Sequence, residues 1–132
     1  TGQNNRNREQ EVAQATRKAK LLAKELNVPV VLLSQLNRES EGRPGGRPEL
    51  FHLRESGAIE QDADVVMLLY RPALARLTTD RESGYPTEGL GVVIIAKQRN
   101  GETGNVYFRH NPEMTKITEY VPPLEYMLKH AK

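Results

Sequence analysis

Apolar side chains near the start of the chain recur with the period of a helix. They stand at three- and four-residue steps after the polar, Asn-rich residues 1–7, at Val12, Ala15, Ala19, Leu22 and Leu26. This spacing predicts an amphipathic helix that packs its apolar face against a core and ends at Asn27 and Pro29. The cations between the apolar positions are those of a solvated surface: Arg17, Lys18, Lys20 and Lys24.

Three later runs of apolar residues predict β-strands. They cover residues 30–33, 65–70 and 90–97. An unbroken apolar run is typical of a strand that is buried on both faces, and such strands belong to parallel sheets flanked by helices. A short helical segment around residues 56–62 precedes the second run.

The third run continues into a predicted β-hairpin. Asn100, Gly101 and Gly104 supply turn residues, and "NVYF" returns as a strand. Residues 114–120 alternate and predict one more strand, while residues 122–132 are expected to form a C-terminal tail whose Met and Leu side chains dock on a neighbour. The expected fold is therefore α/β, with a mostly parallel sheet flanked by helices and an antiparallel hairpin at one edge.

Composition narrows the class of protein. The chain has 132 residues, enough for one modest domain or part of one, and contains no Cys, which excludes a disulfide framework and a thiolate metal site. No run approaches the ~20 apolar residues of a membrane span, so we expect a cytoplasmic protein without a membrane partner. The net charge is only +2, so attraction to nucleic acid depends on where the charges lie.

Two cations at the tip of the predicted hairpin form the first candidate site. Lys97 and Arg99 are two positions apart, and side chains alternate along a strand, so both point to one side while Gln98 points to the other. We call Lys97 and Arg99 the cationic fork. Exposed cations near strand ends commonly only solubilise a sheet edge, so a function requires an anion within reach of the fork.

Polar residues follow the first apolar run at its carboxyl end. Ligands of open α/β sheets bind outside the carboxyl ends of the strands, which makes Gln35 a second candidate, although its amide can equally satisfy loop backbone. Residues 39–53 form a loop rich in Gly, Pro and charge, typical of a functional segment or a solvated connector. The phosphate-binding motif G-x-x-x-x-G-K-[ST] is absent, and His52, His110 and His130 lack metal-ligand spacing, so no metal site is expected.

Three segments carry a resemblance to a known family. They are "NREQEV...LAKELNVPVVLLSQLNRE", "LRESGAIEQDADVVMLLYR" and "AKQRNGETGNVYFRHN". In this order and spacing they resemble, over residues 7–121, the C-terminal part of the bacterial replicative DNA helicase, the DnaB family. The resemblance implies that residues 1–121 are the C-terminal part of a RecA-like ATPase domain, in a homohexamer that moves along single-stranded DNA and unwinds the duplex at the replication fork.

The same resemblance implies cofactors and partners. The Walker A loop and the Walker B acid of the family precede the matched region, so ATP and Mg²⁺ are expected to be bound mainly outside this chain. Single-stranded DNA, identical subunits, primase and a helicase loader are the expected partners. The chain alone is expected not to hydrolyse ATP, because it has no phosphate loop.

The resemblance also implies roles for particular residues. Gln35 resembles the sensor of the γ-phosphate. Lys97 and Arg99 resemble an arginine finger that reaches the γ-phosphate bound by the next subunit, where positive charge stabilises the transition state of phosphoryl transfer. The loop that holds the backbone of single-stranded DNA is matched by Arg54, Glu55 and Gly57.

Two other functions stay open at this point. The chain can act as a non-catalytic module that binds single-stranded DNA or packs between subunits. A RecA-like recombinase or a circadian-type ATPase is a weaker alternative, because "KQRNG" and "LRESGAIEQDAD" occur together. The loop of residues 39–53 is richer in Pro and Gly than the family pattern, so no DNA contact is assigned to Arg43 or Arg47.

Overall fold

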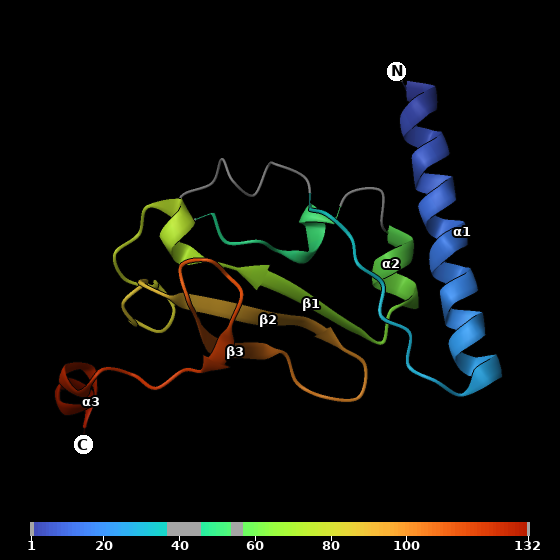
Figure 1. Ribbon diagram of the computed structural model, residues 1–132. Coiled ribbons are helices and arrows are strands. Elements are labelled where there is room, and N and C mark those ends of the chain that lie inside the picture. The colour runs from blue at the N-terminus through green and yellow to red at the C-terminus, as the bar shows by residue number, and fades with distance from the viewer. Residues whose placement is uncertain (1, 37–45, 54–56, 132) are drawn as a thin grey trace.

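The computed structural model describes residues 2–36, 46–53 and 57–131 (Figure 1). The elements follow one another in the order α1 (Gly2–Leu26), the 3-10 helix η2 (Leu50–His52), α2 (Gly57–Asp62), β1 (Val65–Tyr70), the 3-10 helix η3 (Pro72–Ala75), β2 (Leu90–Gln98), β3 (Gly104–His110), β4 (Ile117–Glu119) and α3 (Leu124–His130). The predicted helices near the start and before the second apolar run are confirmed. The predicted strands at residues 65–70, 90–97, 105–108 and 114–120 are confirmed as well.

The four strands of the described residues form one sheet in the order β1-β2-β3-β4. Every neighbouring pair is antiparallel. The expectation of a mostly parallel sheet is therefore wrong for this part of the chain. An apolar strand indicates burial and not direction, and β1 and β2 are joined by an excursion through η3 that lets β2 return against β1.

The segment that follows α1 corrects a second expectation. Asn27 ends α1 with a positive φ of 53°, as expected for a helix stop. Residues 30–33, predicted as a buried strand, are not in a strand, and Val31 and Leu33 are 79% and 91% exposed. A strand buried on both faces needs hydrogen-bonded neighbours and a covering layer, and the described residues provide neither there.

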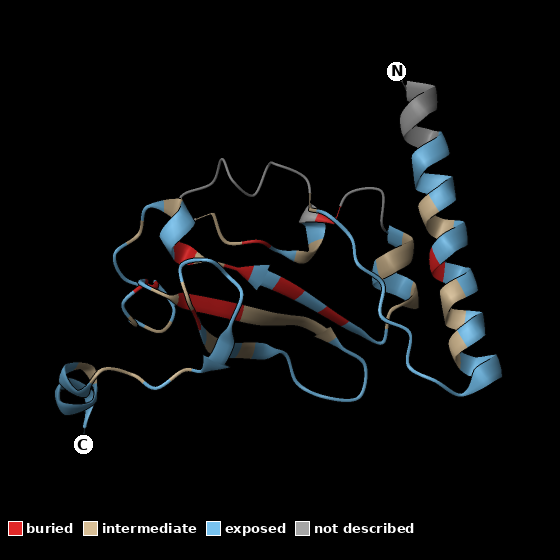
Figure 2. Cartoon of the chain, in the orientation of Figure 1, coloured by how far each residue is buried: buried red, intermediate tan, exposed pale blue. Residues whose placement is uncertain are grey.

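The face that α1 buries coincides only in part with the predicted apolar face. Among the described side chains of α1, Thr16 is buried and the predicted positions Val12 and Ala19 are half-buried, whereas Leu22 and Leu26 are exposed. The side of α1 that packs is the side toward α2, as Figures 1 and 2 show. α2 is a single short helix, so it covers the small residues near Thr16 and leaves the leucine face open. In the described part of the chain, no helix is both long and apolar enough to span a lipid bilayer.

The core lies between α2 and one face of the sheet. Leu53, Val66 and Leu68 form its centre. Partly buried apolar residues pack around this centre, namely Leu36, Leu50, Ile59, Ala63, Ile94 and Ala96. β1 alternates between exposed and buried positions, so one of its faces lines this core while the other is open (Figure 2). The core thus places α2 directly over the end of the hairpin that carries the cationic fork.

α3 lies at the opposite end of the molecule from α1 (Figure 1), and its Tyr126 belongs to a group of aromatic rings. We call Tyr85, Tyr107, Tyr120 and Tyr126 the tyrosine cluster. The ring centroid of Tyr85 lies 5.0, 4.8 and 4.9 Å from those of the other three. The Tyr126 hydroxyl donates to the Ser83 carbonyl at 2.6 Å. α3 is therefore fixed by its Tyr, and the docking of its Met and Leu side chains on a neighbour stays a prediction.

Candidate functional site

The cationic fork lies at a β-bulge between β1 and β2. Val66 pairs with Lys97, but the next residue, Met67, pairs with Ile95, so Ala96 is an extra residue in β2. Side chains of directly paired residues in an antiparallel ladder point to the same face of the sheet. The bulge therefore turns Lys97 to the face of Val66, which is the face that α2 covers.

Both cations of the fork bind the carboxyl end of α2. The Lys97 ammonium donates to the carbonyl of Glu60, and Arg99 Nη2 donates to the carbonyl of Gln61 at 2.9 Å. The last carbonyls of a helix have no partner within the helix and carry the negative end of its dipole, so cations stabilise them. The prediction that both cations point to one side is confirmed by these two contacts on neighbouring carbonyls.

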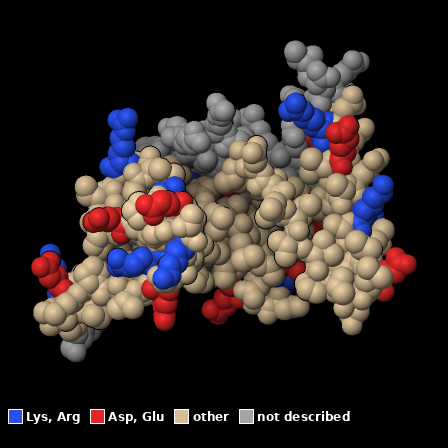
Figure 3. Space-filling model, in the orientation of Figure 1, with Lys and Arg blue, Asp and Glu red and all other residues tan. Residues whose placement is uncertain are grey.

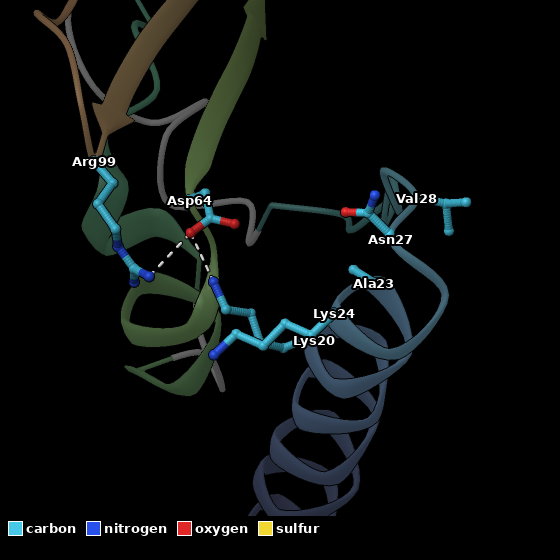
Figure 4. Close-up of a pocket in the computed structure, with 7 residues that line it drawn as sticks. All are labelled: Lys20, Ala23, Lys24, Asn27, Val28, Asp64 and Arg99. Atoms are coloured by element: carbon cyan, nitrogen blue, oxygen red, sulfur yellow. Dashed lines mark hydrogen bonds and ion pairs between the residues drawn. The ribbon is translucent and has the colours of Figure 1, made fainter.

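Asp64 holds Arg99 at two further points. The backbone N–H of Arg99 donates to the Asp64 carbonyl at 2.9 Å, and Arg99 Nη1 lies 2.9 Å from Asp64 Oδ1. Lys20 from α1 donates to the same Oδ1 at 2.7 Å. Figure 4 shows Arg99, from the hairpin, and Lys20, from α1, converging on one oxygen of this carboxylate. The hydrogen bond from Lys20, together with the charges of Lys20, Arg99 and Lys24, holds the pKa of Asp64 below its ordinary value despite some desolvation.

An open cavity of about 450 Å³ adjoins these contacts. It is lined by Lys20, Ala23, Lys24, Asn27, Val28, Asp64 and Arg99 (Figure 4). Three of the lining residues are cations and one is an anion, so the cavity favours a negatively charged group. Elsewhere, on the face in view in Figure 3, basic and acidic side chains are interspersed, so the described residues form no large field of one sign over that face.

The structure does not gather the other predicted site residues around the fork. Gln35 lies in the coil before Leu36, and its side chain is exposed. Gly57 is the first residue of α2, and a Cβ there would meet no other atom. Arg54 and Glu55 lie outside the described residues, and so does Arg43.

Arg47, His110 and His130 each contact other parts of the fold, while the side chain of His52 lies outside the description. Arg47 Nη2 donates to Asn105 Oδ1 at 2.8 Å, and its guanidinium lies 5.6 Å from the ring centroid of Tyr70. His110 is buried, and the ring of His130 stacks on Tyr126. Within the described ranges, no three His, Cys, Asp or Glu side chains are grouped so that they could hold a metal ion.

Sequence reasoning missed Asp64 and Lys20. Lys20 was expected to be only a solvated cation, yet its side chain is largely covered and bound to Asp64. The sequence offered one signal. Asp64 stands directly between a predicted helix and a predicted buried strand, and Lys97 and Arg99 stand at the tip of the predicted hairpin without an assigned partner. This pattern could have suggested an ion pair, but not the participation of a helix that is 44 residues distant in the sequence.

Similarity to known proteins identifies the family of the chain. The family model described as "DnaB-like helicase C terminal domain" matches residues 1–119. The chain belongs to this family. The "Replicative DNA helicase DnaB" of Haemophilus influenzae is 43% identical over 120 residues, which are 91% of this chain and 24% of that protein. The chain spans about a quarter of the length of the curated DnaB-like helicases that it matches.

Solved structures agree with the family and with its fold. One of them, described as an "ATPase Domain", has a TM-score of 0.73 and 39% identity, and the match covers 85% of this chain and 37% of that one. A second, "The Structure Of A DnaB-Like Replicative Helicase And Its Interactions With Primase", has a TM-score of 0.74 and 36% identity, over 86% of this chain and 26% of that one. The expected α/β class, as part of a RecA-like ATPase domain of a DnaB-like helicase, is therefore confirmed, although the strands of the described part are antiparallel.

Proposed function

We propose that this chain is part of the motor of an ATP-dependent replicative DNA helicase, and that it supplies the arginine finger of that motor. Membership of the DnaB-like helicase family supports the first statement. The cationic fork supports the second, because Arg99 is fixed at three points and yet its side chain is 43% exposed. This combination of fixed geometry and access is the observation that carries the proposal.

The fork is suited to phosphoryl transfer in trans. Negative charge on the transferred phosphoryl group is stabilised by cations that are in place before the reaction, and Arg can bind two phosphate oxygens with its planar guanidinium. In the proposed hexamer, Arg99 faces the γ-phosphate held by the next subunit, and Lys97 holds α2 and adds positive charge. Gln35, an exposed amide, senses the γ-phosphate by donating to one of its oxygens.

The DNA contact is proposed at the start of α2. Arg54 and Glu55 precede this helix in the sequence and lie outside the described residues, Gly57 is its first residue, and the fork binds its carboxyl end. A shift of the start of α2 on single-stranded DNA would therefore reach the fork through this six-residue helix. Replacing Arg54 with Ala should weaken binding of single-stranded DNA and lower its salt dependence, as expected for a lost phosphate contact.

ATP and Mg²⁺ fit this site only in part. The cations Lys97 and Arg99 suit the phosphates, whereas the described residues offer no cluster of carboxylates for the metal. ATP supplies the phosphoryl group, and its main ligands are proposed to lie outside this chain. Primase, a helicase loader and identical subunits are proposed partners of the complete protein. Its cytoplasmic location stays a prediction.

Mixing two defective subunits tests the trans role. One subunit of the full-length helicase carries Arg99→Ala, and the other carries an inactivated phosphate-binding loop. Each alone should lack ATP hydrolysis on single-stranded DNA. Mixed hexamers should regain part of it, because some sites combine an intact loop with an intact Arg99. Absence of recovery, with mixed assembly shown by cross-linking, contradicts action in trans.

A non-catalytic role of the fork has one observation in its favour, because both cations already bind α2. If the fork only caps that helix, Arg99→Ala should lower stability and leave ATP hydrolysis per folded hexamer unchanged. Arg81→Ala is the matched control, since Arg81 is an exposed Arg in a turn outside the site. It should alter neither property.

A further inference from the structure

We propose that Asp64 is the positioning residue of Arg99, and that Lys20 locks the Asp64 carboxylate in place. This inference rests on the proposed role of Arg99 in phosphoryl transfer. Asp64 is not placed to touch the nucleotide. It acts through the guanidinium that it holds.

The contacts with Asp64 fix both the backbone and the side chain of Arg99. The hydrogen bond between the Arg99 N–H and the Asp64 carbonyl, at 2.9 Å, fixes the chain just after β2 ends. The contact between Nη1 and Oδ1, at 2.9 Å, then sets the direction of the side chain. Nη2 donates to the Gln61 carbonyl at the same distance, so both terminal nitrogens are held and rotation of the guanidinium plane is restricted.

This arrangement leaves donors for a phosphate. A guanidinium has five N–H groups, and the two side-chain contacts use one each. Within the described ranges no partner takes the other three N–H groups, and the side chain is 43% exposed. Asp64 thus orients Arg99 and leaves N–H donors for a phosphate, as a positioning residue must.

Lys20 makes the carboxylate a fixed support. It donates to Asp64 Oδ1 at 2.7 Å, the same oxygen that meets Arg99, and so the carboxylate is held by cations from two elements. An isolated exposed ion pair is weak, but a network of three charged groups, in which two cations share one carboxylate oxygen, is more constrained. Since Lys20 belongs to α1, this network also ties the orientation of α1 to that of Arg99.

The test uses the full-length helicase and the variant Asp64→Asn, which keeps the size of the side chain and removes its charge. The kcat for ATP hydrolysis on single-stranded DNA should fall about tenfold. This loss lies between the small effect of removing a surface ion pair and the larger effect of misplacing a catalytic group by about 1 Å. The KM for ATP should change less than about twofold, because the finger acts mainly in the transition state. Asp64→Glu, which restores the charge, should recover most of the loss.

Matched variants separate positioning from a general effect of charge. Asp62→Asn makes the same chemical change two residues away, at the last residue of α2, and should leave kcat unchanged. Lys20→Met should lower kcat by about two- to threefold, as expected for one weakened exposed contact. In the Asp64→Asn background it should lower kcat no further.

A double-variant cycle decides the inference. If Asp64 acts through Arg99, adding Asp64→Asn to Arg99→Ala should cause no additional loss of kcat. Losses that multiply would overturn the inference, and so would an unchanged kcat in Asp64→Asn when Arg99→Ala lowers it. If Arg99→Ala itself leaves kcat unchanged, the proposed function of the fork has failed, which is a separate result.

Discussion

The two ends of this molecule are held by different physical means. At the end with the cationic fork, ion pairs and hydrogen bonds to helix carbonyls join α1, α2 and the hairpin, and Asp64 at their centre is 61% exposed. At the other end, the tyrosine cluster joins α3 to the sheet through packed rings. Exposed charged groups keep donors that a phosphate can reach, whereas packed rings offer none. The difference supports the proposal that chemistry belongs to the first end and anchoring to the second.

The largest expected effect comes from removing the proposed arginine finger. Arg99→Ala in the full-length helicase should lower the kcat for ATP hydrolysis by about 10³- to 10⁵-fold, the range known for arginine fingers. Arg99→Lys should recover little of this loss, because Lys has no planar pair of donors. Steady-state hydrolysis with saturating single-stranded DNA measures both. A fully active Lys variant would show that charge alone is sufficient.

Breaking the tyrosine cluster should affect anchoring and not chemistry. Tyr85→Ala removes the ring that contacts the other three, and should cost about 2 kcal/mol of local stability. Hydrogen exchange should then lose protection at residues 124–130, while kcat stays within about twofold of the original value. A large fall in kcat with α3 still protected would mean that the two ends are not independent.

A smaller loss is expected from a single hydroxyl of the same cluster. Tyr126→Phe keeps the ring and removes the hydrogen bond to the Ser83 carbonyl, which should cost about 1 kcal/mol. Hydrogen exchange of α3 measures this change against Tyr85→Ala. If both variants expose α3 equally, the hydroxyl, and not the ring packing, holds the helix.

The smallest effect, and the one that separates the ends most directly, is their opposite response to pH. Burial raises the pKa of Tyr107 and Tyr120 above the ordinary 10.0. Their contribution to the free energy of unfolding is therefore complete below pH 10 and is lost as the pH rises through the higher pKa values of the folded state. The hydrogen bond from Lys20 lowers the pKa of Asp64 below 3.8, so the contribution of Asp64 to the free energy of unfolding is complete above that pH and is lost as the pH falls further.

Local probes can follow the two ends separately. Absorbance of the phenolates reports the tyrosine cluster, and the carboxyl chemical shift of Asp64 reports the fork. The tyrosines should ionise at lower pH in Tyr85→Ala than in the original protein, because their burial is reduced. An unchanged phenolate titration in that variant would contradict the assignment of the shift to burial.

Local sequence patterns were sufficient for most of the elements. The periodic run before Asn27 predicted α1, and the apolar runs and turn glycines predicted β1, β2 and the hairpin. The direction of the sheet and the fate of residues 30–33 were wrongly predicted, since both depend on which distant segments lie beside them. For the site, the shared direction of Lys97 and Arg99 followed from alternation, whereas Asp64, Lys20 and the bulge depend on tertiary packing that no local pattern contains.

The extra residue at Ala96 has a consequence for changes in length. Deleting Ala96 would let β2 pair regularly with β1 and would leave Lys97 opposite Val66, so the cations would stay beneath α2. If the bulge were lost with every residue retained, Ala96 would pair with Val66, and alternation would bring Gln98 beneath α2 in place of the cations. A substitution in this strand changes one side chain at a time, whereas the gain or loss of a bulge redirects the whole hairpin tip. Homologous helicases with the same mechanism should therefore keep the fork on the Val66 face, either by this bulge or by a strand that is one residue shorter.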